Sequence, residues 1–259
     1  MIDIGALVTR KSYNCDIIFE VVSFEGDQAI LHGKTVRLIA DAPLDDLVLV
    51  DDDEIRKAEA EEDELIETIK LEEEEWNRNR FLTGKILHID GDERYMNKCL
   101  ELYKKLGIYA IGVRIKETHI PEVILKYTTF FNPDIVVITG HDSFNRKEPK
   151  YLENYRHSKY FIEATKKIRE RYPVINQPII IAGACQSHFE ALISAGANFA
   201  SSPSRVNIKS LDPAIIAVKC ATTPINQPIR VLETIKKTSH KEEGIGGIES
   251  FGTMKRLYY

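Results

Sequence analysis

The chain has 259 residues, 43% of them hydrophobic and 8% aromatic, which allows one large or two modest domains with a packed core. Its formal net charge of −5 does not suggest a dedicated binder of polyanions, so nucleic acid is only a secondary hypothesis. The four cysteines stand far apart without a Cys-x-x-Cys pair, which indicates a reducing compartment. Because no secretory signal and no run of about 18 apolar residues is visible, we expect no membrane partner.

The first 80 residues divide into two regions of different composition. Residues 1–50 contain short alternating apolar runs separated by turn pairs such as Gly26-Asp27 and Gly33-Lys34, which predict a small antiparallel β-barrel of SH3-like size. Residues 51–80 are dense in Asp and Glu with few apolar positions. This composition favours a solvated acidic helical linker over a metal site.

Residues 81–259 alternate between short β-branched strands and helices, which predicts one α/β domain with a mostly parallel sheet covered on both faces. The expected strands are 85–89, 109–115, 134–139, 178–182, 197–201 and 214–221, and the expected helices are 93–106, 121–131, 153–172, 187–195 and 231–237. In such a sheet the binding crevice lies at the carboxyl ends of the strands.

Cys185 follows the expected strand 178–182, where the chain passes into a sequence that can start a helix. Gly183-Ala184 before it permits close backbone approach, and Gln186-Ser187 after it is polar, so we expect the chain to reach the surface here. A helix N-terminus favours a thiolate. We therefore interpret Cys185 as a candidate nucleophile and the other three cysteines as inert core residues.

His141 follows the expected strand 134–139 in the sequence Gly140-His141-Asp142. It should therefore occupy the crevice position of another strand, where an imidazole can act as the base that a cysteine nucleophile requires. His188, three residues after Cys185, is a competing base and would also give a Cys-x-x-His metal motif. Because a second ligand pair is missing, we expect no metal and no cofactor.

Several other segments at the same edge are open to more than one interpretation. The loop 201–205, which contains Ser204 and Arg205, either lines a substrate cleft or caps a strand. Arg156 lies in a basic stretch that more simply shapes a surface. Asp90-Gly91-Asp92-Glu93 and 244–249 contain glycine but match neither phosphate-binding motif, so we interpret both as turns.

Long segments of the chain, Thr139–Asp142, Tyr155–Lys159, Ala182–Glu190 and Ala195–Asn207, resemble the YabG family of sporulation-specific cysteine proteases, peptidase family U57. The resemblance implies an endopeptidase of the mother-cell cytoplasm, associated with the spore coat. It further implies that the protein partners are spore-coat and germination proteins, cleaved after basic residues.

The histidine and cysteine strands separately resemble the caspase-type clan, which implies a caspase-like three-layer fold with His141 and Cys185 as the catalytic pair. That clan places glycine directly after the histidine, whereas Asp142 follows here, so the donors of the oxyanion hole stay open. The residues that we carry forward beside this pair are Gly140, Asp142, Gly183 and Gln186 near the oxyanion, and His188, Glu190, Ser204, Arg205 and Arg156 in the cleft.

The implied preference for basic residues raises two further expectations. Asp142, Glu190, Asp212 and Glu249 are unranked candidates for the acid that receives a basic side chain, and Arg78 and Arg80 are candidate self-cleavage sites.

Two other functions stay open. The chain is alternatively an interaction protein that binds peptide or nucleic acid, with a non-catalytic α/β scaffold, or an amidotransferase-like Cys-His hydrolase.

Overall fold

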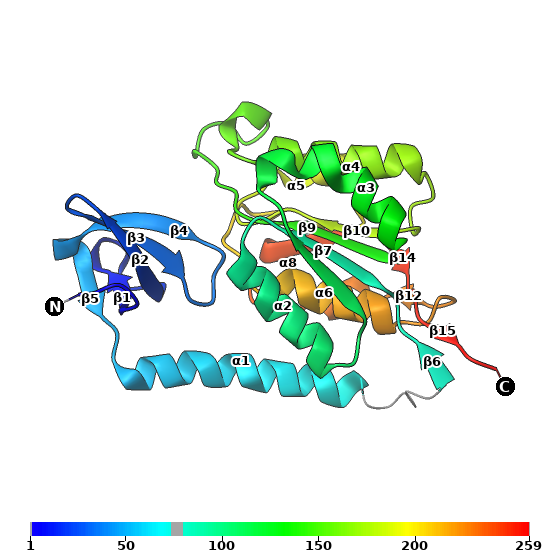
Figure 1. The fold of residues 1–259 in the computed structure, drawn as a ribbon, viewed down its shortest axis with the longest axis horizontal. Helices are drawn as coiled ribbons and strands as arrows, with labels where there is room; N and C mark the ends of the chain where they lie inside the picture. Colours follow the sequence, from blue (N-terminus) through cyan, green and yellow to red (C-terminus); the bar gives the residue numbers. More distant parts are fainter. Residues whose placement is uncertain (1, 74–79, 259) are drawn as a thin grey trace. The chain divides into compact units, whose positions relative to one another are not determined.

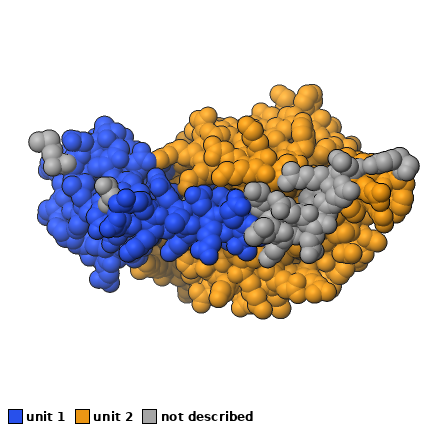
Figure 2. Space-filling view, turned by 90° about the horizontal axis from the view of Figure 1, so that it is seen from below, with its two compact units in different colours: residues 1–69 blue, residues 70–259 orange. Residues whose placement is uncertain are grey.

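The computed structural model describes residues 2–73 and 80–258. The chain forms two compact units, residues 1–69 and residues 70–259, which Figure 2 shows in different colours. Within the described part of the chain, no helix combines the length and the apolar character that crossing a bilayer requires.

The first unit contains an antiparallel five-stranded sheet in the order β4-β3-β2-β1-β5. Its strands are β1 (Leu7–Arg10), β2 (Phe19–Glu25), β3 (Gln28–Gly33), β4 (Ile39–Pro43) and β5 (Leu47–Leu49), with short 3-10 turns η1 (Lys11–Tyr13) and η2 (Leu44–Asp46). Alternate residues such as Val8, Phe19 and Leu31 point into one small core. The acidic sequence that follows forms helix α1 (Asp52–Glu73). The antiparallel sheet is as predicted, and the SH3-like class stays a prediction.

The second unit is built on a mostly parallel six-stranded sheet in the order β13-β11-β10-β9-β7-β8. The parallel strands are β7 (Ile86–Asp90), β8 (Ala110–Arg114), β9 (Ile135–Thr139), β10 (Ile179–Ala182) and β11 (Phe199–Ser201), and β13 (Ile245–Gly247) runs antiparallel to β11. β8 and β9 lie on opposite sides of β7. The order of the strands therefore reverses between β7 and β9, and open α/β sheets bind their ligands at the carboxyl ends of such strands.

Helices cover both faces of this sheet, as Figure 1 shows. One face carries α3 (Ile120–Phe131), α4 (Ser158–Arg171) and α5 (Phe189–Ser194), and the other carries α2 (Glu93–Lys105) and α6 (Asp212–Thr222). Leu87 and Ile89 of β7 with Val136 and Ile138 of β9 pack toward α3 and α4. The central strands are buried on both faces, which explains their continuous apolar sequences.

Shorter elements complete the unit. They are β6 (Phe81–Leu82) paired with β15 (Lys255–Arg256), β12 (Pro228–Ile229) paired with β14 (Ser250–Phe251), helices α7 (Val231–Ile235) and α8 (Lys241–Gly244), and the turns η4 (Glu117–His119) and η5 (Leu152–Asn154).

The structure corrects three sequence-based expectations. Residues 214–221, expected as a strand, belong to helix α6. Ten of the eleven residues from Asp212 to Thr222, all but Lys219, are buried, and a helix that is buried on every side cannot be told from a buried strand by periodicity. The helix expected over 153–172 begins only at Ser158, and the helix expected from 187 begins at Phe189, so His188 precedes it.

Candidate active site

The ends of β9 and β10 bring His141 and Cys185 to the same edge of the sheet. The two strands are parallel neighbours, and Ile138 pairs with Ala182. His141 and Cys185 each follow their member of this pair by three residues (141 − 138 and 185 − 182). The predicted pair therefore comes from neighbouring strand ends, close to the reversal of strand order between β7 and β9.

Three hydrogen bonds hold His141 in place. Its backbone N–H donates to Glu117 Oε1 at 2.8 Å, and its carbonyl oxygen lies 2.7 Å from His157 Nδ1. On the ring, Nε2 lies 2.9 Å from Asp92 Oδ2. The ring also meets Tyr95 edge-on, with centroids 5.7 Å apart. His141 thus has a fixed ring orientation, with one nitrogen assigned to a carboxylate.

Asp92 is the residue of this site that sequence reasoning missed. It follows β7 by two residues and is the N-cap of α2, where its Oδ1 accepts from the N–H groups of Arg94 and Tyr95 at 2.9 and 3.4 Å. Burial disfavours the charged form of Asp92, but the hydrogen bond and charge of His141 outweigh it, so the pKa of Asp92 lies below its usual value. The segment 90–93 is therefore more than the turn that we expected.

The Glu117 side chain fills the space next to Gly91 and Gly140. The residue begins η4 after β8 and is 5% exposed. A Cβ on Gly91 would lie 2.1 Å from Glu117 Oε1, and a Cβ on Gly140 would lie 2.5 Å from it, so both positions require glycine for space. Because the His141 N–H already donates to Glu117, it is not a donor for an oxyanion.

Asp142 connects β9 to the starts of two helices. Its Oδ1 accepts from the backbone N–H groups of Ser143 and His157 at 2.9 and 2.7 Å, and its Oδ2 accepts from the hydroxyls of Ser187 and Ser158. Burial raises the pKa of Asp142 even though these four donors oppose the rise. With four donors on one buried carboxylate, Asp142 is a structural tie and does not suit the binding of a basic substrate side chain.

Asp212 is likewise unsuited to that role. It is 1% exposed, and its carboxylate accepts from the backbone N–H of Lys209 and from the N–H and hydroxyl of Ser239. Glu249 is exposed and lies near the end of the chain, just before β14.

Cys185 is completely buried, contrary to our expectation that the chain surfaces there. Its Sγ accepts from the backbone N–H of Ile208 at 3.3 Å. Ser187 is also buried, and its hydroxyl accepts from the N–H of Ala184 at 2.9 Å. The thiol therefore lies under the segment that follows β11, which we call the covering segment (residues 202–208).

Gln186 joins the covering segment to the loop after His141. Its backbone N–H donates to Val206 O at 3.0 Å, its Nε2 donates to Asn207 Oδ1 at 3.0 Å, and its Oε1 accepts from the N–H of Phe144 at 3.1 Å. Its φ of +56° lies in the left-handed region. Gly183, at φ +105°, packs near Leu192 and Ser201 and gives the chain the bend that leads to Cys185.

Three of the cleft candidates form one cluster on the covering segment and α5. Arg205 donates through both Nη atoms to the Glu190 carboxylate and through Nε to the Tyr155 hydroxyl at 2.9 Å. His188 caps α5, and its Nδ1 lies 3.3 Å from Glu190 Oε2. Its ring is tilted by 34° against the Tyr155 ring, with centroids 4.8 Å apart. His188 is thus a helix cap within this cluster, whereas His141 is the histidine held by Asp92.

Two of the remaining candidates, Ser204 and Arg156, adjoin Arg205 and Tyr155 of this cluster in the sequence. Ser204 and Arg156 are exposed, and their backbone N–H groups donate to Glu243 O and Ser143 O. Arg80 is exposed just before β6, and Arg78 lies outside the described residues. Within the ranges 2–73 and 80–258, no group of three or more His, Cys, Asp or Glu residues is arranged to hold a metal ion.

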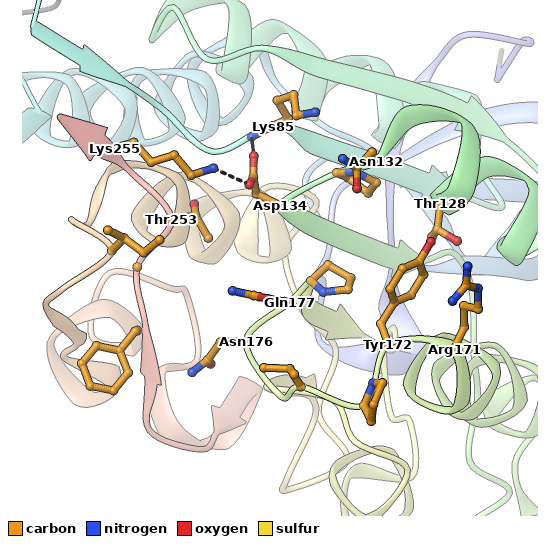
Figure 3. Close-up of a pocket in the computed structure, with 17 residues that line it drawn as sticks. Lys85, Thr128, Asn132, Asp134, Arg171, Tyr172, Asn176, Gln177, Thr253 and Lys255 are labelled. Atoms are coloured by element: carbon orange, nitrogen blue, oxygen red, sulfur yellow. Dashed lines mark hydrogen bonds and ion pairs between the residues drawn. The ribbon is translucent and has the colours of Figure 1, made fainter. Parts of the chain in front are cut away.

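A pocket of about 690 Å³ lies at the opposite edge of the same sheet (Figure 3). It surrounds the start of β9, where Asp134 accepts from Lys255 Nζ and from the backbone N–H of Lys85, both at 2.9 Å. Asn176, Gln177 and Pro178, which precede β10, line another side. This pocket is therefore separated from His141 and Cys185 by the length of the strands.

Comparison with known proteins identifies the family of the chain. The family model "YabG peptidase U57" matches residues 3–258. The chain is 41% identical over 280 residues to the sporulation-specific protease YabG of Bacillus subtilis (strain 168), an alignment that covers 97% of this chain and 96% of that protein. No solved structure matches the chain. The chain therefore belongs to peptidase family U57, the YabG proteases.

Proposed function

We propose that this sporulation-associated peptidase is a cysteine endopeptidase with Cys185 as nucleophile and His141 as its base. The observation that carries the proposal is the register of β9 and β10, which sets both residues at neighbouring strand ends with His141 anchored to a carboxylate. Family membership supports proteolysis, and the residue types at this edge support the cysteine class.

The chemistry follows the usual acyl-transfer route. His141 takes the thiol proton, and the thiolate sulfur attacks the scissile carbonyl carbon to form a tetrahedral intermediate. When the C–N bond breaks, the imidazolium gives its proton to the leaving amine, and an acyl-enzyme remains. A water molecule, deprotonated by His141, then attacks the thioester and releases the carboxylic acid and the thiol.

The oxyanion requires backbone donors near the thiol. The N–H of Cys185, at the bend that Gly183 permits, is our first candidate, and the N–H groups of Gly140 and Asp142 are the second. The N–H of His141 is engaged by Glu117 and is left out. Because Sγ is buried against Ile208, the covering segment has to move before a substrate carbonyl can reach it.

The finer function is also part of the proposal. We propose a caspase-like peptidase domain that cleaves spore-coat and germination proteins after basic residues in the mother cell. Glu190 is the preferred acid for the basic side chain, because its carboxylate already binds a guanidinium and its side chain is 59% exposed. Self-cleavage after Arg78 or Arg80 would separate the first unit from the peptidase.

The test is labelling and turnover with matched variants. An arginyl chloromethyl ketone should modify Cys185 in the wild type, and Cys185→Ala should neither react nor cleave protein. Fragments ending at Arg78 or Arg80 should appear only in the wild type, and activity should survive chelators. Cleavage by Cys185→Ala would refute the cysteine mechanism, and hydrolysis of glutamine without cleavage of peptides would favour the amidotransferase-like alternative.

A further inference from the structure

A buried chain of polar side chains runs behind His141 on the α2 face of the sheet. The Tyr103 hydroxyl of α2 lies 3.0 Å from His88 Nδ1, and His88 Nε2 lies 3.4 Å from Asp90 Oδ2. Asp90 Oδ1 accepts from the backbone N–H of Asp92 at 2.9 Å, and Asp92 Oδ2 lies 2.9 Å from His141 Nε2. This row of side chains thus contains two histidine–aspartate pairs, His88–Asp90 and His141–Asp92. The proposed cysteine mechanism uses only His141.

Burial makes the inner pair unusual. His88, Asp90 and Tyr103 have no exposed surface. A carboxylate or imidazole inside a sheet destabilises the fold unless its hydrogen bonds are made, so apolar side chains would be the simpler choice at positions 88 and 90. The contacts run from Tyr103 through His88 and Asp90 to Asp92, the residue beside His141. This indicates that the buried residues act at the site.

The two oxygens of Asp92 have separate partners. Oδ1 accepts from the first N–H groups of α2, and Oδ2 faces the His141 ring. A carboxylate on Nε2 fixes the imidazole in the form with a proton on that nitrogen and stabilises the imidazolium. The proton exchanged during the reaction is then carried by Nδ1.

We propose that Asp92 is the positioning residue of His141, and that the buried pair His88–Asp90 fixes Asp92 in the orientation that this requires. The inference rests on the proposed function, because it gives His141 the role of base. Asp90 acts by accepting the backbone N–H of Asp92, and His88 acts on Asp90 through the 3.4 Å contact of its Nε2 with Oδ2, which is electrostatic and not a hydrogen bond. Tyr103 completes the chain at its far end.

Three variants of Asp92 separate positioning from helix capping. Asp92→Asn and Asp92→Ser both keep a side-chain oxygen that can cap α2, and both remove the carboxylate from His141. Asp92→Ala removes both interactions. Each variant is compared for its melting temperature, for kcat and KM on an arginine-containing peptide, and for the pH dependence of Cys185 alkylation by iodoacetamide, which involves no substrate recognition.

We expect Asp92→Asn and Asp92→Ser to have melting temperatures near that of the wild type. Their kcat should fall by about 10²-fold, with little change in KM. Loss of the carboxylate destabilises the imidazolium and with it the thiolate, so the alkylation midpoint should move up by about one pH unit. Tyr103→Phe and His88→Gln should move the midpoint in the same direction by less, because they act through Asp92.

Three outcomes overturn the inference. If only Asp92→Ala is impaired, Asp92 is a helix cap and nothing more. If KM for arginine substrates rises while the alkylation midpoint stays, Asp92 binds the substrate side chain instead. If Asp92→Asn behaves as proposed but Tyr103→Phe and His88→Gln match the wild type, the inner pair has no part in positioning. Cleavage by Cys185→Ala is a separate result, because it refutes the proposed function itself.

Discussion

The two edges of the parallel sheet differ in what they offer a ligand. The amino edge has the pocket of about 690 Å³, with exposed apolar side chains such as Val174, Ile225 and Phe251. The carboxyl edge has the candidate nucleophile and base, and the thiol there is fully buried. The open pocket and the two candidate residues therefore lie at opposite edges of the sheet, and the thiol at the carboxyl edge is covered in this conformation.

Helix polarity explains why side chains that cap helices lie at the carboxyl edge. In a parallel α/β sheet, the helices begin where the strands end, so their unpaired N–H groups face the carboxyl edge. Asp92 caps α2, Asp142 binds the start of α4 through Ser158, and His188 caps α5. Carboxylates are stabilised beside such helix ends, and the amino edge lacks this set of donors.

Loss of a catalytic side chain is the sharpest test of this contrast. His141→Ala should lower kcat by about 10²- to 10⁴-fold with the fold intact, because the base is lost. Arg171→Ala at the amino-edge pocket and His188→Ala in the cap of α5 should stay within about threefold of the wild type, since neither has a role in proton transfer. Turnover of a peptide by His141→Ala at the original rate, together with inactive His188→Ala, would reverse the assignment.

The tie made by Asp142 should dominate the stability of the carboxyl edge. Asp142→Ala leaves buried hydroxyl and N–H donors without an acceptor, and we expect a loss of about 2–4 kcal/mol in the free energy of unfolding. Urea titration followed by circular dichroism measures this loss. The exposed Glu153→Gln provides the control, with a change within about 0.5 kcal/mol. Equal stability of the two variants would show that Asp142 is not a structural tie.

A substitution that crowds Glu117, the acceptor of the His141 N–H, should have a smaller effect on activity and stability. Gly91→Ala would place a Cβ against the Glu117 carboxylate, which then has to move and release the His141 N–H. We expect kcat to fall by about tenfold with a loss of about 1–3 kcal/mol in stability. Glu117→Asp shortens the clashing side chain, so the double variant should be less impaired than the sum of the two single variants. Strict additivity would mean that the two residues do not collide.

The smallest effect is expected at the ion pair between Arg205 of the covering segment and Glu190 of α5. The hydrogen bond from Arg205 lowers the pKa of Glu190, so the pair contributes stability above the unfolded pKa of about 4.3 and loses it as pH falls through the lower folded pKa. Because Glu190 is largely exposed, Glu190→Gln should cost about 0.5 kcal/mol at pH 7. Thermal melts of variant and wild type should differ at pH 7 and converge near pH 3. A difference that grows in acid contradicts this sign.

The sequence was informative where local pattern decides the structure. The apolar runs of β9 and β10 predicted two buried parallel strands, and their ends located His141 and Cys185. The same reasoning failed for α6, which is buried on every side and therefore shows no helical period. Its true class is set by packing against the sheet, which no local pattern contains.

Two features of the site depend on the order of strands in the sheet and on contacts between distant parts of the sequence. Sequence reasoning could not predict them. Asp92 meets His141 only because β7 pairs with β9, and the sequence does not state the order of strands. Ile208, 23 residues after Cys185, contacts its sulfur and so helps to bury it. The polar residues after Cys185 looked like a surface signal, but Ser187 uses its hydroxyl inside the protein.

The cover over Cys185 also bears on how long this thiol stays reduced. Oxidation of cysteine to sulfenic acid and beyond requires an accessible thiolate, and Cys185 has no exposed surface while Ile208 donates to its sulfur. Cys15, which we expected to lie in the core, is exposed instead, so peroxide should consume it first. If residues 202–208 open to admit substrate, as proposed above, the same movement would expose the thiol to oxidants, so the cover would protect Cys185 until substrate binds.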